Sequence, residues 1–197
     1  MTAERPRGDR RADLVSAAAR LFSERGYHGT SMQHLADALG LLRGSLYAHI
    51  GSKEDLLFDV VNDGAARFLA RGAASLEAEA ATPRLRRFIV GHVETAIEHL
   101  DAGTVFLNEW RYLSAERRSV IQAKRDQYEQ ILTSIIEGGI ESGEFRADVD
   151  VRFAVLLVLS AGNWVYEWYR PDGRLGATEI GERFAELIVT GLKEGSQ

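Results

Sequence analysis

The chain has 197 residues, of which 45% are hydrophobic, and this supply of apolar side chains is enough for a substantial core. It contains no cysteine, which excludes disulfides, thiolate zinc sites and thiol catalysis. No apolar run follows the N-terminal arginines, and no stretch is long and apolar enough to span a bilayer. We therefore expect a cytoplasmic protein without a secretory signal or a membrane segment.

The net charge of −5 by itself argues against a nucleic-acid partner, because affinity for DNA depends on neutralising phosphates. The charge is, however, unevenly distributed. Residues 1–54 carry eight basic and six acidic side chains, a net of +2, whereas the remainder carries a net of −7. The basic end is the part whose charge suits DNA.

The first residues predict an arm followed by a helix. Residues 2–8 are polar and basic, so they form either a DNA-contacting arm or a frayed terminus. A helix is expected from Asp9, and Gly26 is placed to end it with a left-handed cap. Its apolar stripe consists of Leu14, Ala18, Leu21 and Phe22.

The next stretch, Thr30 to Leu57, predicts two short helices and the start of a third. Spacings of three and four place four apolar residues on one face of the first helix: Met32, Leu35, Ala36 and Leu39. Thr30 and Gln33 have the spacing of a capping box at its start, and Gly40 ends it. A second capping box, Ser52 with Asp55, begins the third helix.

Between these two lies a second short helix with distinct sides. Its apolar residues fall four apart on one side: Leu42, Leu46 and Ile50. Arg43, Gly44 and Tyr47 fall on the other side. A short helix, a turn with glycine and a second helix with a polar exposed edge is typical of a helix-turn-helix, whose second helix enters the major groove of DNA.

The rest of the chain also has helical periodicity. We expect a helix from Lys53 to about Ala80, one starting at the cap Thr82-Pro83, a break at Asp101–Gly103, a short apolar segment Val105–Leu113, a helix Ala115–Ser142, a segment Val151–Tyr169 and a last helix capped by Thr178. The segment Val151–Tyr169 is apolar on nearly every side, so a second subunit is expected to cover part of it. The last two helices of each chain would then form a four-helix homodimer interface.

The stretch TSMQHLADALGLLRGSLYAHIGSKEDLL resembles the N-terminal signature of the TetR family of bacterial transcriptional repressors, including Gly-x-Leu-Tyr-x-His and Ser-Lys-Glu. The resemblance implies an all-α fold. Residues 1–52 would form a three-helix helix-turn-helix DNA-binding domain with a basic N-terminal arm, and residues 53–197 a larger helical ligand-binding and dimerisation domain. The ending WVYEWYRPDG is similar to a subset of the family that responds to acyl-CoA thioesters.

The resemblance also implies roles for individual residues. Arg43 and Ser45 would read base edges, and Gly44 would let the backbone approach the DNA. The residues that would hold phosphates are Thr30, Tyr47, His49 and Lys53. Leu42 departs from the family pattern, because many relatives have a capping serine there, and Ile50 replaces a common phenylalanine.

Candidate pocket residues lie in the larger domain, where aromatic and basic side chains recur. They are His92, Trp110, Arg111, Lys124, Arg125, Tyr128, Trp164 and Trp168. The aromatic members equally suit a core or a dimer contact. The basic members belong to a cluster that also contains Arg117 and Arg118, which suits either a solvated face or the phosphates of a CoA ligand. We expect no metal, no cofactor and no catalytic residue.

Together these features predict a ligand-controlled repressor that binds palindromic double-stranded operator DNA as a homodimer. A small apolar effector, such as an acyl-CoA thioester, would release it. Two alternatives remain at this level: a helical enzyme using carboxylates such as Glu94, Glu98 or Glu109, and a helical small-molecule-binding adaptor without a DNA role.

Overall fold

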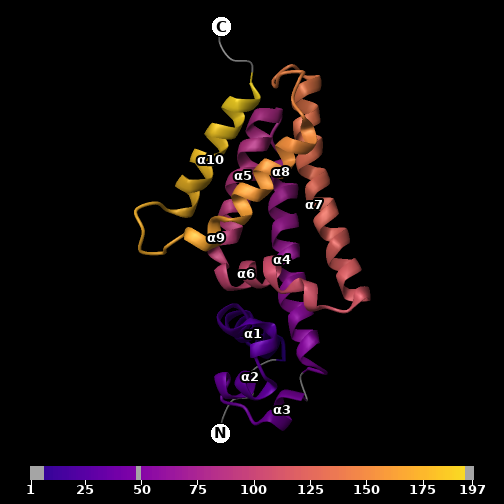
Figure 1. Ribbon diagram of the computed structural model, residues 1–197, viewed down its shortest axis with the longest axis vertical. Helices are drawn as coiled ribbons and strands as arrows, with labels where there is room; N and C mark the ends of the chain where they lie inside the picture. The colour runs from indigo at the N-terminus through magenta and orange to yellow at the C-terminus, as the bar shows by residue number, and fades with distance from the viewer. Residues whose placement is uncertain (1–6, 48–49, 194–197) are drawn as a thin grey trace. The chain divides into compact units, whose positions relative to one another are not determined.

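The computed structural model describes residues 7–47 and 50–193, and every regular element in these ranges is helical (Figure 1). The elements are α1 (Arg7–Gly29), α2 (Met32–Ala38), α3 (Arg43–Tyr47), α4 (Lys53–Ser75), α5 (Ala81–Glu98), α6 (Leu100–Asn108), the 3-10 turn η1 (Trp110–Tyr112), α7 (Ala115–Glu141), α8 (Val151–Asn163), α9 (Val165–Trp168) and α10 (Ala177–Leu192). The predicted all-α fold is confirmed. Within the described ranges, no helix has the length and apolar character needed to cross a membrane.

The chain divides into two compact units. The first unit contains the described residues up to Ala65 together with Asp101–Gln122, and the second contains Ala66–Leu100 and the described residues from Ala123 onward. The boundary expected after residue 52 follows the order of the chain. Packing instead groups the first turns of α4 and the segment Asp101–Gln122 with the N-terminal helices.

In the first unit, α1 buries the stripe predicted from its periodicity: Leu14, Ala18, Leu21 and Phe22. Glycines in the left-handed region stop the helical path where the sequence places them, at Gly26 (φ 72°) and Gly40 (φ 63°). The capping box at the start of α2 is formed by other residues than predicted. Ser31 accepts from the backbone N–H of His34, and the His34 ring accepts from the N–H of Ser31.

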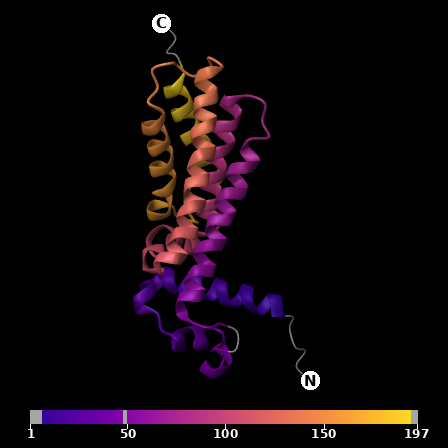
Figure 2. The same cartoon turned by 90° about the vertical axis from the view of Figure 1, so that its right-hand side faces the viewer.

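In the second unit, α5, α7, α8 and α10 lie alongside one another (Figures 1 and 2). An apolar cluster fills the space between α5, α9 and α10, and its buried members are Val93, Ile97, Val165 and Ile180. The start of α5 has no cap from its own sequence, since Ala80 occupies that position. The carboxylate of Glu144 instead accepts from the N–H groups of Ala81 and Thr82, each at 2.8 Å.

Three local predictions in the remainder of the chain are wrong. Thr82 does not cap α5, because Glu144 supplies the acceptor from a distant part of the chain. Asp101–Gly103 is part of α6 rather than a break. Thr178 lies inside α10, where its hydroxyl donates to Glu94 at 2.6 Å instead of capping the helix.

Candidate nucleic-acid interface

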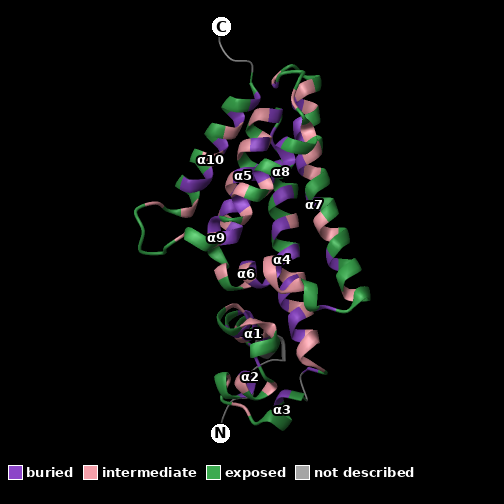
Figure 3. Cartoon of the chain, viewed as in Figure 1, coloured by how far each residue is buried: buried purple, intermediate pink, exposed green. Residues whose placement is uncertain are grey.

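The short helix α3 has one buried and one exposed side. Leu46 is fully buried and packs in the core that also contains Leu35 and Ile50, which fixes the orientation of the helix. Arg43, Gly44, Ser45 and Tyr47 are exposed, and Figure 3 shows α3 as largely exposed. The spacing predicted this exposure for Arg43, Gly44 and Tyr47. It also placed Leu42 on the packed side with Leu46, and that prediction is wrong, because the Leu42 side chain is 80% exposed. We call the exposed side of this helix the α3 surface, and its residues are Arg43, Gly44, Ser45 and Tyr47. It presents a guanidinium, a hydroxyl and a phenol on a helix anchored by buried Leu46.

The side chains of Arg43 and Tyr47 contact each other. The guanidinium carbon of Arg43 lies 5.9 Å from the centre of the Tyr47 ring, a distance at which a cation is attracted to the aromatic face. Arg43 keeps its hydrogen-bond donors in a planar fork, the geometry that matches the O6 and N7 acceptors of guanine. His49, expected to hold a phosphate, lies outside the described residues.

Thr30 does not have the exposure that its predicted phosphate contact requires. Its side chain is 1% exposed, and its hydroxyl donates to the backbone oxygens of Leu21 and Gly26, each at 3.0 Å. The prediction for the Thr30 side chain is wrong, because the hydroxyl is used inside the unit to close the turn between α1 and α2.

Lys53 also makes internal contacts. Its Nζ donates to the backbone oxygens of Tyr27 and Thr30, each at 2.9 Å, and lies 4.2 Å from the centre of the Tyr27 ring. Partial burial lowers the pKa of the Lys53 amine. An ammonium has three N–H donors, so one remains for a phosphate while two tie the start of α4 to the turn before α2.

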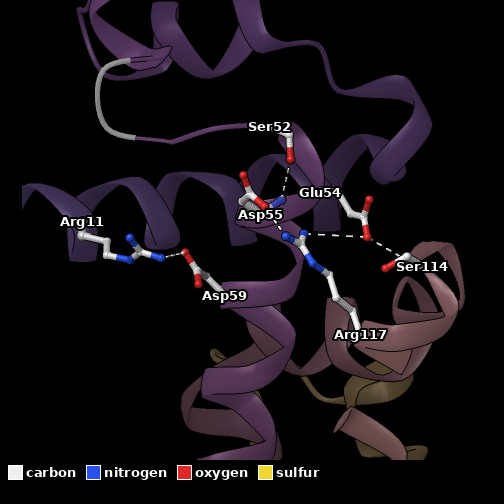
Figure 4. A network of polar contacts seen from close by, with 7 residues as sticks. All are labelled: Arg11, Ser52, Glu54, Asp55, Asp59, Ser114 and Arg117. Carbon is white, nitrogen blue, oxygen red and sulfur yellow. Dashed lines mark hydrogen bonds and ion pairs between the residues drawn. The ribbon is translucent and has the colours of Figure 1, made fainter. Parts of the chain in front are cut away.

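A charged network within the first unit joins α1, α4 and the start of α7 (Figure 4). Arg117 at the start of α7 pairs with Asp55 and, at 3.7 Å, with Glu54, both in the first turn of α4. Glu54 also accepts from the backbone N–H of Ser114 at 2.9 Å. On the other side of α4, Arg11 pairs with Asp59 at 2.7 Å.

This network holds its carboxylates in the charged form. The hydrogen bond from Arg117 lowers the pKa of Asp55, and the N–H of Ser114 lowers the pKa of Glu54. The sequence placed Arg117 in a basic cluster for a ligand or for solvent. No local pattern links it to Asp55, because the contact joins residues 62 positions apart.

A second long-range contact in the first unit involves Tyr27. Its backbone N–H donates to the carboxylate of Glu109 at 2.7 Å, and its ring stacks on Tyr112 at 6.0 Å between centroids. Burial raises the pKa of the Tyr27 phenol. The segment that carries Glu109 and Tyr112 thus contacts the same turn that Lys53 secures.

In the second unit, His92 and Tyr128 form a buried polar pair among aromatic rings. The Nδ1 atom of His92 lies 3.0 Å from the Tyr128 hydroxyl, and the rings of Phe68 and Phe88 pack against the pair. Burial lowers the pKa of His92 to about 4, and the side chain of Asn163 opposes this shift. The ring is therefore neutral near pH 7, and burial also raises the pKa of the Tyr128 phenol.

The other candidate pocket residues are more exposed than this pair or belong to the first unit. Trp164 is 60% exposed and Trp168 is also exposed. Lys124 and Arg125 are half-buried on α7, where burial lowers the pKa of the Arg125 guanidinium. Trp110 and Arg111 form part of η1, which belongs to the first unit.

Helices α8 and α10 present an apolar surface to solvent in the described chain. Its most exposed large residues include Phe153, Leu156, Leu157 and Leu187, the last 73% exposed. A cleft of about 630 Å³ between the two helices is lined by Phe153, Leu157 and Leu187 among others. We call the exposed apolar residues of the two helices, Phe153, Leu156, Leu157 and Leu187, the α8–α10 surface. An exposed apolar surface of this kind is typical of an interaction site.

Both the N-terminal and the C-terminal part of the chain match known protein families. Residues 14–60 match the family described as bacterial regulatory proteins, tetR family, and residues 78–192 match the tetracyclin repressor-like C-terminal domain. The chain is 33% identical to the HTH-type transcriptional repressor KstR2 of Mycobacterium tuberculosis over 191 residues, 94% of each protein.

Two solved structures are also similar. The TetR family transcriptional regulator PfmR from Thermus thermophilus has a TM-score of 0.85 and 39% identity over 92% of this chain and 99% of that one. AibR, solved in complex with isovaleryl coenzyme A and operator DNA, has a TM-score of 0.81 and 30% identity over 93% of this chain and 97% of that one.

Proposed function

Because the chain belongs to the TetR family of bacterial regulatory proteins, we propose that it is a transcriptional repressor that binds a palindromic operator as a homodimer and releases it when a small effector binds. The observation that carries this proposal is the α3 surface, where Arg43, Gly44, Ser45 and Tyr47 are exposed together on a helix anchored by buried Leu46. Its cellular location would be the cytoplasm, where the operator lies.

In this proposal α3 enters the major groove, with Arg43 and Ser45 facing base edges and Gly44 leaving room for the backbone. Tyr47 and Lys53 contact phosphates, Lys53 through its remaining N–H donor. Base contacts set the sequence preference, whereas phosphate contacts fix the position of the helix on the duplex.

The α8–α10 surface supports the second part of the proposal, a two-fold symmetric dimer. Two copies that meet through the same surface would bury Phe153, Leu157 and Leu187 on both sides, as an isologous interface requires. A symmetric dimer presents two α3 helices to two half-sites, which explains why the operator is expected to be palindromic.

The effector is proposed to bind in the second unit near His92 and Tyr128. These two groups offer hydrogen bonds inside surroundings made of Phe68 and Phe88, and a neutral imidazole and a phenol suit the carbonyl of a thioester. The complex of AibR with isovaleryl coenzyme A favours an acyl-CoA as the class to test first. An effector that binds the released conformation more tightly shifts the population away from the operator.

A binding experiment with the DNA upstream of the protein's own gene tests the DNA-reading proposal. Arg43→Ala is expected to weaken specific binding by about 10- to 100-fold, the range for one bidentate base contact, and to leave binding to unrelated duplexes nearly unchanged. Arg174→Ala, which removes the same charge from an exposed loop, is the matched control. Equal losses for the two variants would contradict the role of Arg43.

A thermal-shift series tests the effector. Acyl-CoA thioesters of increasing chain length are compared with free CoA and the free acids, because a ligand that binds the native state raises its apparent stability. The proposal expects a shift that needs both the acyl chain and the thioester, and a smaller shift in Tyr128→Phe. Equal shifts with free CoA would contradict recognition of the acyl group.

A further inference from the structure

We propose that Leu42 recognises a thymine methyl group in the operator, an inference that rests on the proposed DNA-binding function. Among the described residues Leu42 is the most exposed large hydrophobic side chain, at 80%. It directly precedes Arg43, the residue expected to read a guanine, and Ser45 is exposed two positions further on. Leu42 therefore places an exposed apolar side chain next in the chain to the residues proposed to face the bases.

Leu42 contributes little to the fold through its side chain. Its backbone oxygen accepts from the N–H groups of Ser45 at 2.9 Å and Leu46 at 3.2 Å, so it is the residue from which α3 starts. Serine, threonine, asparagine or aspartate at this position would accept a further N–H, which leucine cannot do. The side chain also buries almost nothing, so the residue serves neither capping nor packing.

Because leucine at this position neither caps α3 nor packs in the core, we assign its side chain a role in recognition rather than in the fold. The major groove offers one apolar feature that a leucine can contact, the C5 methyl group of thymine. Contact with this methyl group would exclude water from both partners and would distinguish thymine from cytosine, which lacks it. The preference would add to the contacts made by Arg43 and Ser45.

The test begins with an operator sequence selected from random duplexes by the full-length protein. Each thymine of one half-site is then replaced by deoxyuridine, which removes the methyl group and leaves the pairing groups unchanged. Wild-type protein is expected to lose about four-fold in affinity at one position, the factor that corresponds to burying one methyl group. Leu42→Ala and Leu42→Ser are expected to bind the thymine and uracil forms of that position equally.

Two further measurements complete the design. Leu76→Ala, a truncation of an exposed leucine directly after α4, should keep the full four-fold preference. Leu42→Ser should melt at a higher temperature than wild type, because serine caps α3, while it loses the methyl preference. Separating these two effects within one variant excludes misfolding as the cause of the loss.

The outcomes distinguish this inference from the function it rests on. Specific binding that is indifferent to every uracil substitution, or a methyl preference that Leu42→Ala retains, would overturn the role of Leu42 alone. Failure of the wild-type protein to select any duplex sequence would overturn the proposed function, and the role of Leu42 with it.

Discussion

Lys53 illustrates how one side chain can serve the fold at a position where a family pattern implies a DNA contact. Its two hydrogen bonds, to the oxygens of Tyr27 and Thr30, tie α4 to the turn before α2. Lys53→Met keeps the length of the aliphatic chain and removes the ammonium. We expect it to lower the free energy of unfolding by about 2 kcal/mol, because both bonds have a charged donor.

Chemical denaturation without DNA measures this effect. Lys193→Met, at the exposed end of α10, is the control and should leave the free energy of unfolding within about 0.5 kcal/mol of wild type. An unchanged free energy of unfolding for Lys53→Met, with weaker DNA binding, would assign the lysine to phosphate contact alone.

His92 predicts a specific loss of stability in mild acid. In the unfolded chain its ring takes up a proton near pH 6.5, whereas in the folded protein burial lowers its pKa to about 4. Between these values the unfolded state binds more protons, so stability falls as the pH decreases. From pH 7 to pH 5 the expected contribution is a loss of about 2 kcal/mol.

Denaturation curves of wild type and His92→Gln at both pH values test this expectation. Glutamine does not titrate and can still bond to Tyr128, so the variant should show a smaller difference between pH 7 and pH 5. Asp55, Glu54 and Glu144 have lowered pKa values, so their contributions are lost only at more acidic pH. Parallel pH profiles for the two proteins would contradict a neutral, buried His92.

At the scale of the elements, periodicity predicted the helices well and their ends less well. The stripe of α1 and the span of α7 depend on side chains within the same helix, which a sequence pattern records directly. The start of α5 depends on a tertiary contact. Glu144 caps α5 from 63 residues away, and no local pattern predicts such a partner.

Neighbouring glycines in α7 provide a matched test of helix packing. A methyl group on Gly139 would lie 2.1 Å from the Phe145 ring, whereas one on Gly138 would meet nothing within 4 Å. Both substitutions gain the same helix propensity, about 1 kcal/mol. We expect Gly138→Ala to stabilise by up to that amount and Gly139→Ala to destabilise by about 2 kcal/mol, because the ring must move.

Thermal unfolding of the two variants side by side measures the difference. If Gly139→Ala melts as high as Gly138→Ala, the Phe145 ring does not pack against α7 at this glycine.

At the scale of the whole molecule, the α8–α10 surface predicts the assembly. Leu157→Glu and Leu187→Glu place a carboxylate on the surface that a second copy would bury, which costs several kcal/mol in a desolvated interface. We expect monomers by sedimentation and at least a ten-fold loss of operator affinity. Leu76→Glu is the control for an exposed leucine elsewhere, and dimers that persist in both interface variants would contradict this surface as the contact.

The sequence supported the α3 surface better than the effector site, for a physical reason. Arg43 and Tyr47 lie four residues apart on one side of the same short helix, so their common exposure follows from spacing, whereas Ser45 was assigned from the family resemblance. The pairing of His92 with Tyr128 joins helices 36 residues apart, and spacing cannot show it. Thr30 is buried because its hydroxyl donates to the backbone oxygens of Leu21 and Gly26 in α1, and the family pattern that implied a phosphate contact carries no information on this bonding.

The central claim is that the exposed side of α3 reads a symmetric DNA sequence. Selection of bound duplexes from a random pool by the full-length protein, followed by sequencing, tests it most directly. We predict one consensus of two inverted half-sites, with reduced preference at a guanine in each half when Arg43→Ala repeats the selection. Absence of any enriched symmetric sequence at low salt, where electrostatic contacts with DNA are strongest, would contradict it.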